Sequence, residues 1–223
     1  HYRLTILSEI DYEQSIANLG DGRLDGLVWC KLSDKRSVLD QISDLRIPCV
    51  ALCSPPPEGL HSVTFFSCDN KGGASMIVHR MAELGHRKIL FVLEAGEAMT
   101  PDAQARLSGF LQASGELGLE VGEQDVVVWN YDAREFKDWW AARPPHTAIF
   151  AWNEGVAGNV LAQAAAAGVE VPRLLSVVGF DSTRYCDTTT PKLTAVRQPI
   201  SQMAKAATEH LFRLLGGEEG AQK

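Results

Sequence analysis

The stretch LLSVVGFDSTRYCDTTTPKLTAVRQPI, which runs from Leu174 to Ile200, decides the fold. It opens with a nearly continuous apolar run over Leu174–Gly179, which predicts a fully buried strand. The acid Asp181 follows almost at once. Because ligands of parallel α/β sheets bind beyond the carboxyl ends of the strands, Asp181 occupies the position of a ligand-facing residue. A polar passage and a second short apolar run then precede a predicted amphipathic helix, Ile200–Leu215.

Short apolar runs alternate with helical segments along the rest of the chain. Further strands are expected at Arg3–Leu7, Leu24–Trp29, Cys49–Cys53, Val63–Ser67, Lys88–Leu93, Asp125–Trp129 and Thr147–Ala151. Further helices are expected at Asp11–Leu19, Asp34–Leu45, Lys71–Leu84, Pro101–Leu117, Arg134–Ala141 and Glu154–Ala167, with Asp69 and Asn70 as caps of the third. Buried strands that alternate with helices predict parallel sheets covered on both faces, so the fold class is α/β.

Composition narrows the class of protein. The 223 residues carry a formal net charge of −7, which disfavours direct contact between this part of the protein and the phosphates of nucleic acid. No run of eighteen apolar residues predicts a membrane span. The five cysteines form no C-x-x-C pair, and reduced thiols in a cytoplasmic protein are expected rather than a metal site. No nucleophile–base pair and no cofactor motif is found, so neither an enzyme nor a cofactor is predicted.

Three other residues near the predicted strand ends each allow two interpretations. Asn153 either caps the helix that follows it or presents its amide to a hydroxyl-rich ligand. Tyr131 either packs on the surface or forms a platform for a sugar or base. Arg106, near the start of its helix, opposes the helix dipole, which hints at a partner acid or a ligand. Together with Asp181, they place four polar side chains at strand ends of one half of the chain.

Several motifs in sequence order carry a family resemblance. They are HRMAELGHRKILFV, ARLSGF, TAIFAWNEGVAGNVLAQAAAAGVEVP, QMAKAATEHLFRLL and the stretch quoted first. The combination of LGHR, SVVGFD and TAVRQP is specific, although no one of these motifs would be. With them the chain resembles the effector-binding domain of the lactose-repressor (LacI/GalR) family of bacterial transcription regulators, over nearly its whole length.

The resemblance implies a fold and its division. It implies two Rossmann-like lobes with parallel sheets flanked by helices, of the periplasmic binding protein-like type I, here truncated at both ends. The first lobe is expected to comprise residues 1–93 and 197–223, and the second residues 94–196. The DNA-binding headpiece, the family's first strand and helix, and its last strands are expected to be missing from this sequence.

The resemblance also implies the site and the partners. Arg106, Tyr131, Asn153 and Asp181 would line a ligand cleft from the second lobe, and Asp69 with Asn70 would lie near its mouth in the first. A small sugar-like effector would bind there. Operator DNA would be bound through the absent headpiece, and a homodimer would form through the first-lobe helices Lys71–Leu84 and Ile200–Leu215. The alternative from another class is a secreted solute-binding protein of a sugar transporter, which shares the fold.

Overall fold

A computed structural model describes residues 24–30, 44, 47–53, 62–96, 100–130 and 132–216 of the chain. The chain divides into two compact units. Unit 1 comprises His1–Cys68 and Pro199–Lys223, and unit 2 comprises Asp69–Gln198. The expected elements Arg3–Leu7, Asp11–Leu19 and, apart from Asp44, Asp34–Leu45 lie outside the described residues. No helix in the described ranges is long and apolar enough to cross a membrane.

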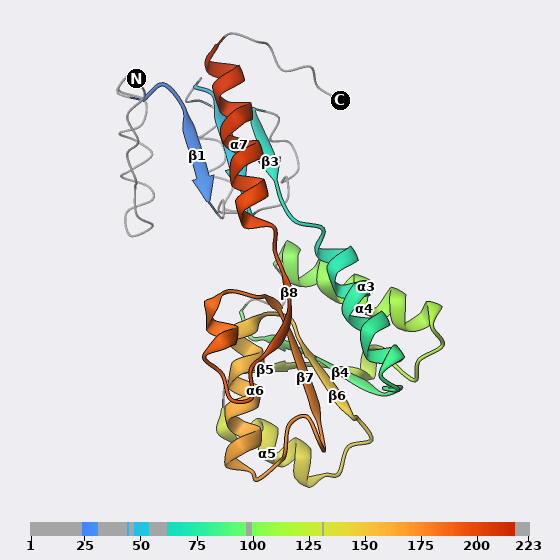
Figure 1. Cartoon of the computed structure of the whole chain (residues 1–223). Helices are drawn as coiled ribbons and strands as arrows, with labels where there is room; N and C mark the ends of the chain where they lie inside the picture. Colours follow the sequence, from blue (N-terminus) through green and yellow to red (C-terminus); the bar gives the residue numbers. More distant parts are fainter. Residues whose placement is uncertain are drawn as a thin grey trace. The chain divides into compact units, whose positions relative to one another are not determined.

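Unit 1 contains a parallel three-stranded sheet in the order β1-β2-β3, formed by Leu27–Cys30, Cys49–Leu52 and Val63–Phe66. The central strand β2 is buried along its whole length. The long helix α7, Ile200–Leu215, packs on this sheet, as Figure 1 shows. Because the chain returns to unit 1 at Pro199, segments from both ends of the sequence build this core.

The apolar stripe of α7 belongs to this core. Met203, Ala207 and Leu211 are buried against Val50 and Leu52 of β2. The stripe therefore covers the sheet of its own unit, and it is not an exposed face that could meet a second copy of the chain. A dimer through α7 would have to use its other faces.

Unit 2 contains a parallel five-stranded sheet in the order β5-β4-β6-β7-β8. Its strands are β4 (Ile89–Glu94), β5 (Val126–Trp129), β6 (Ala148–Ala151), β7 (Ser176–Asp181) and β8 (Thr194–Arg197). The order reverses direction after β4, since the chain goes first to β5 on one side and then to β6 on the other. Such a reversal leaves a crevice at the carboxyl ends of the strands, where ligands of this fold class bind.

Helices cover both faces of this sheet. Figure 1 shows α3 (Asn70–Glu83) and α4 (Pro101–Glu116) on one face, and α5 (Ala133–Ala141) and α6 (Glu154–Ala166) on the other. Phenylalanines fill the core between α4 and the sheet, where the ring centres of Phe110 from α4 and of Phe91 and Phe150 from the strands are 4.9 to 6.0 Å apart. The prediction of parallel sheets flanked by helices is therefore confirmed in this unit.

The chain first passes from unit 1 to unit 2 between Cys68 and Asp69, which is earlier than the expected division at residues 93–94. β4 forms hydrogen-bonded ladders with β5 and β6, so it is a central strand of the second sheet. Helix α3 packs on α4 and likewise belongs to unit 2. The division at 93 needs this correction because alternation of strands and helices along the sequence does not say which sheet a strand joins. The expected dimer helix Lys71–Leu84 is accordingly part of unit 2.

Two strands also differ from expectation. β7 begins two residues later than predicted and extends to Asp181, so the acid is the last residue of the strand itself. The short run Thr194–Arg197, not predicted as a strand, pairs with β7 as the edge strand β8. This pairing places Arg197 beside Asp181 and brings the end of the quoted stretch back to its carboxylate.

Candidate ligand-binding site

The site is built around Asp181 at the end of β7. The backbone of Asp181 has φ +87°, and that of Ser182 has φ +50°. Residues with a Cβ rarely adopt this left-handed region, at a cost of order 1–3 kcal/mol each, and such strain concentrates at functional sites. The side chain of Asp181 is 26% exposed. The strand thus ends in an abrupt turn that presents a carboxylate with partial access to solvent.

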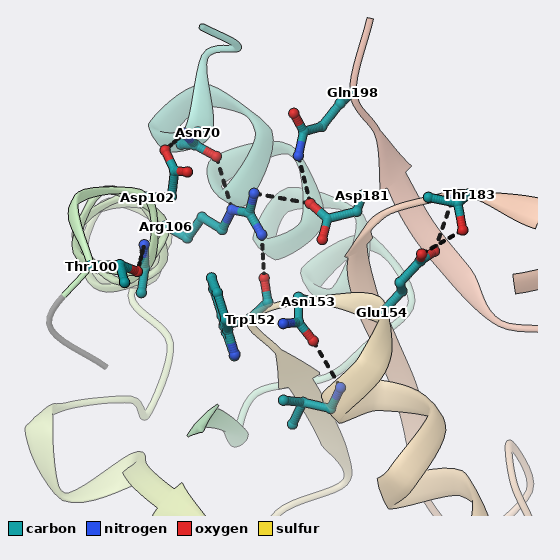
Figure 2. Close-up of polar contacts among 12 residues, drawn as sticks. Asn70, Thr100, Asp102, Arg106, Trp152, Asn153, Glu154, Asp181, Thr183 and Gln198 are labelled. Carbon is teal, nitrogen blue, oxygen red and sulfur yellow. Dashed lines mark hydrogen bonds and ion pairs between the residues drawn. The ribbon is translucent and has the colours of Figure 1, made fainter. Parts of the chain in front are cut away.

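The side chain of Arg106, from α4, is almost completely buried beside this carboxylate. Its Nη2 donates to Asp181 Oδ1 at 3.0 Å, its Nη1 donates to the Trp152 carbonyl oxygen at 2.7 Å, and its Nε donates to Asn70 Oδ1 at 2.8 Å. These three bonds use three of the five N–H donors of a guanidinium group. Figure 2 shows Arg106 at the centre of this network. The side chain therefore ties α3, β7 and the residue that follows β6 to α4.

Asn70, the first residue of α3, is buried and bridges two charged groups. Its Oδ1 accepts from Arg106, while its Nδ2 donates to Asp102 Oδ1 at 2.7 Å. Asp69 has a different role, because its exposed side chain caps α3 by accepting from the Gly72 amide at 2.7 Å. The sequence paired Asp69 and Asn70 as neighbours at a cleft mouth, but only Asn70 joins the Arg106 network.

Aromatic rings flank the guanidinium group. Arg106 Cζ lies 3.9 Å from the centre of the Phe180 ring and 5.4 Å from that of Trp152, distances at which cations are attracted to aromatic faces. A Cβ on Gly73 would lie 2.6 Å from the edge of the Phe180 ring, so α3 can approach β7 only with glycine at this position. The indole Nε1 of Trp152 is buried and has no hydrogen-bond partner among the described residues.

Gln198, just after β8, completes the setting of Asp181. Its Nε2 donates to Asp181 Oδ1 at 2.6 Å, and its backbone N–H donates to the Asp181 carbonyl oxygen at 3.3 Å. Asp181 Oδ1 thus accepts from both Gln198 and Arg106. Within the described part of the chain, the second carboxylate oxygen, Oδ2, accepts no hydrogen bond and remains available.

Asn153 and Glu154 secure the start of α6. Asn153 Oδ1 accepts from the Val156 amide at 2.8 Å, so the helix-cap interpretation of Asn153 holds for this oxygen. In the described ranges its Nδ2 has no protein acceptor, and this donor stays open to a ligand. Glu154 accepts from the backbone amide of Thr183 at 2.7 Å and from the thiol of Cys186 at 3.1 Å, which fixes the segment after β7 to α6. Burial, and then the neighbouring Glu154 carboxylate, raises the pKa of the Cys186 thiol to about 11.

Of the six residues predicted for the site, the structure brings Arg106, Asp181 and Asn70 into one network. Asn153 adjoins it next to Trp152, and Asp69 stands apart as a cap. Tyr131 lies outside the described residues.

Sequence reasoning missed three participants, Gln198, Phe180 and Asp102. The signals were present in the quoted stretch, where Phe180 precedes the acid and Gln198 ends the second apolar run, but the pairing of β8 with β7 was needed to place Gln198 there.

The arrangement suits recognition of a polar uncharged molecule. Asp181 Oδ2 offers a charged acceptor, and Asn153 Nδ2 and the remaining N–H groups of Arg106 offer donors. Vicinal hydroxyl groups, which both donate and accept, match this set. Among the described residues no cluster of three histidine, cysteine or acidic side chains is placed to hold a metal ion.

Comparison with known proteins gives a consistent picture. The family model described as the periplasmic binding protein-like domain matches residues 78–223. The HTH-type transcriptional regulator DegA of Bacillus subtilis is 30% identical over 187 residues, which cover 81% of this chain and 54% of that protein. The HTH-type transcriptional regulator CelR of Thermobifida fusca is 27% identical over 218 residues, which cover 95% of this chain and 63% of that protein. The chain therefore spans only about half to three fifths of these relatives.

Solved structures agree in fold. A complex of the transcriptional regulator CelR with cellobiose superposes with a TM-score of 0.82 at 24% identity, covering 96% of this chain and 66% of that one. A transcription regulator from Lactobacillus plantarum superposes with a TM-score of 0.84 at 21% identity, covering 97% of this chain and 81% of that one. At these identities the likeness concerns the fold.

Proposed function

Because this chain belongs to the periplasmic binding protein-like domain family, in the form found in LacI/GalR regulators, we propose that it is the effector-binding part of a ligand-responsive transcriptional regulator. The observation that carries the proposal is the Arg106–Asp181 pair, with one carboxylate oxygen engaged and the other available. The chemistry is recognition of a small molecule without turnover and without a cofactor.

The effector that fits best is a sugar or a related polyhydroxylated metabolite. A ligand hydroxyl would donate to Asp181 Oδ2, and a neighbouring hydroxyl would accept from Arg106. Asn153 Nδ2 would donate to another hydroxyl and set the orientation. Tyr131 would add an aromatic surface for the apolar face of the sugar, which is a common mode of sugar recognition. One structural neighbour was solved with cellobiose, which makes that sugar a rational first probe.

The complete regulator would act in the cytoplasm as a homodimer and bind a two-fold operator through paired headpieces. The effector would bind one of two conformations more tightly and so change the affinity for DNA. The alternative, a secreted solute-binding protein, is disfavoured because the curated relatives named above are transcriptional regulators. The gene sequence upstream of His1 separates the two, since a helix-turn-helix indicates a regulator and a signal peptide indicates transport.

The direct test is a thermal-shift screen of monosaccharides and disaccharides, with cellobiose included, followed by calorimetry on each sugar that raises the melting temperature. Asp181→Asn keeps the shape of the side chain but removes its charge, so we expect at least tenfold weaker binding, corresponding to about 1.5–3 kcal/mol for a charge-assisted hydrogen bond. Asp187→Asn is the matched control, because Asp187 is an exposed acid in the same segment. Equal affinity of both variants and the wild type would move the site elsewhere.

A further inference from the structure

Within the part of the chain that the structure describes, Gln198 makes two hydrogen bonds, and both go to Asp181. Its main-chain N–H donates to the Asp181 carbonyl oxygen and its side-chain Nε2 to Asp181 Oδ1, at 3.3 and 2.6 Å. A carboxylate oxygen only accepts, so the amide nitrogen of Gln198 must face it. We propose that Gln198 is a positioning residue, which holds the Asp181 carboxylate in its ligand-ready orientation. The proposal rests on the function proposed above.

The backbone of Asp181 explains why such a holder is needed. Two consecutive residues with side chains, Asp181 and Ser182, stand in the left-handed region. Conformations of this kind persist only where surrounding contacts fix them. In the β7–β8 ladder Arg197 is opposite Asp181, so the next residue, Gln198, is placed to bind both the main chain and the side chain of the acid.

As a consequence, the two carboxylate oxygens of Asp181 have different roles. Oδ1 accepts from Gln198 and Arg106, two donors from different elements, and Oδ2 is left for the ligand. Gln198 is also the last residue of unit 2, and Pro199 is the first residue of the returning part of unit 1. The residue that helps to fix the carboxylate is thus the one at which the chain passes between units.

The test uses a glutamate at position 198 as a pH-dependent replacement for the amide. In Gln198→Glu the new carboxyl group faces the Asp181 carboxylate. Of the two cations nearby, Arg106 is already hydrogen-bonded to Asp181 and Arg197 is exposed to solvent, so we expect the like charge of Asp181 to dominate and to raise the pKa of the introduced group in the folded state. A raised folded-state pKa stabilises the fold at low pH and loses that stabilisation as the pH rises through it. The melting temperature without ligand should therefore lie furthest below the wild type at pH 7.5 and approach it at pH 5, where the protonated carboxyl can donate to Oδ1.

Two controls make this reading specific. Gln202→Glu adds the same charge to an exposed position of α7, so its difference from the wild type should not change in the same way with pH. Gln198→Ala removes the amide and should show a deficit that is the same at both pH values. If Gln198→Glu follows the pH behaviour of Gln202→Glu, residue 198 does not face Asp181 and the proposal fails.

A binding arm tests the positioning role, with cellobiose as the probe in calorimetry. We expect Gln198→Ala to bind about tenfold more weakly than the wild type at pH 7.5, because the carboxylate would then adopt its ligand-ready orientation only about a tenth of the time. Gln198→Glu should bind still more weakly at pH 7.5 and recover at pH 5. Unchanged affinity in Gln198→Ala would overturn the positioning role, and this variant decides the matter even if the glutamate variant does not fold. If the wild type binds no cellobiose, the proposed effector class loses support, while the ligand-free pH arm still decides whether Gln198 holds Asp181.

Discussion

Replacement of Arg106 by methionine should destabilise unit 2 before any effect on ligand binding is considered. Methionine preserves much of the apolar stem but donates no hydrogen bond. The buried Trp152 carbonyl oxygen would lose its donor from Arg106, which costs about 1–3 kcal/mol, and the charge-assisted bond to Asp181 is worth about 1.5–3 kcal/mol. Packing of the thioether against Phe180 offsets roughly 1 kcal/mol of this loss. The net expected change in the free energy of unfolding is about 3 kcal/mol.

For a domain of this size each kcal/mol lowers the melting temperature by roughly 3 to 4 °C, so Arg106→Met should melt about 10 °C below the wild type. The assay is urea and thermal unfolding followed by tryptophan fluorescence and circular dichroism, without ligand. Asp181→Asn is the companion variant. It retains an acceptor for Arg106, and its side chain is partly hydrated, so a loss of about 1 kcal/mol is expected. A loss below about 1 kcal/mol in Arg106→Met would refute the view that this side chain holds the unit together.

Three further outcomes are expected. Gly109→Ala should lower the free energy of unfolding by about 2 kcal/mol, because the new Cβ would lie 2.3 Å from a backbone oxygen of α3. Gly115→Ala on the same helix has open space around it and should raise the free energy of unfolding by about 0.5–1 kcal/mol. Denaturant titration of both variants checks this contrast. Burial lowers the pKa of His86, so the folded protein protonates this imidazole less readily than the unfolded chain does. Stability should therefore rise as the pH increases through the range just below 6.5. Melting temperatures measured across this range should rise less for His86→Asn than for the wild type. Burial raises the pKa of Cys49 to about 12, so iodoacetamide at pH 8 should label the exposed Cys30 well before Cys49 in native protein, as read by mass spectrometry, and equal labelling would contradict the buried setting.

The alternation of strands and helices could be predicted from the sequence because each element here carries its own local signal. Ala148–Ala151 is a buried apolar run, Asp69 is a helix cap, and Gly85 has the positive φ of a helix-terminating residue. The assignment of β4 to a sheet could not be predicted in this way. Its sequence says only that it is buried, and which neighbours it pairs with depends on tertiary packing.

The same limit of prediction from sequence applies to the candidate site. Asp181 was identifiable because an acid directly after a buried strand has few structural reasons to be there. The burial of Arg106 was not identifiable, since a side chain on the second turn of a helix can point to solvent or to the core with the same local sequence. The role of Gln198 depends on β8, whose four residues are all half-buried or exposed and give a weak strand signal. The contacts of Arg106, with residues 36 to 75 positions away along the chain, thus had to come from the folded structure.

Under the proposed function, the burial of Arg106 also constrains how a protein of this kind could acquire a new effector. A side chain that joins two helices to β7 and to the residue after β6 cannot be exchanged to suit another ligand without loosening the scaffold that presents the rest of the site. Variation in specificity must therefore arise at positions such as Asn153, whose carbonyl end caps a helix while its amide end is unoccupied by protein within the described residues. An engineer who wishes to redirect recognition should keep Arg106, Phe180 and Gly73 as one unchanging group and diversify the residues around the open oxygen of Asp181.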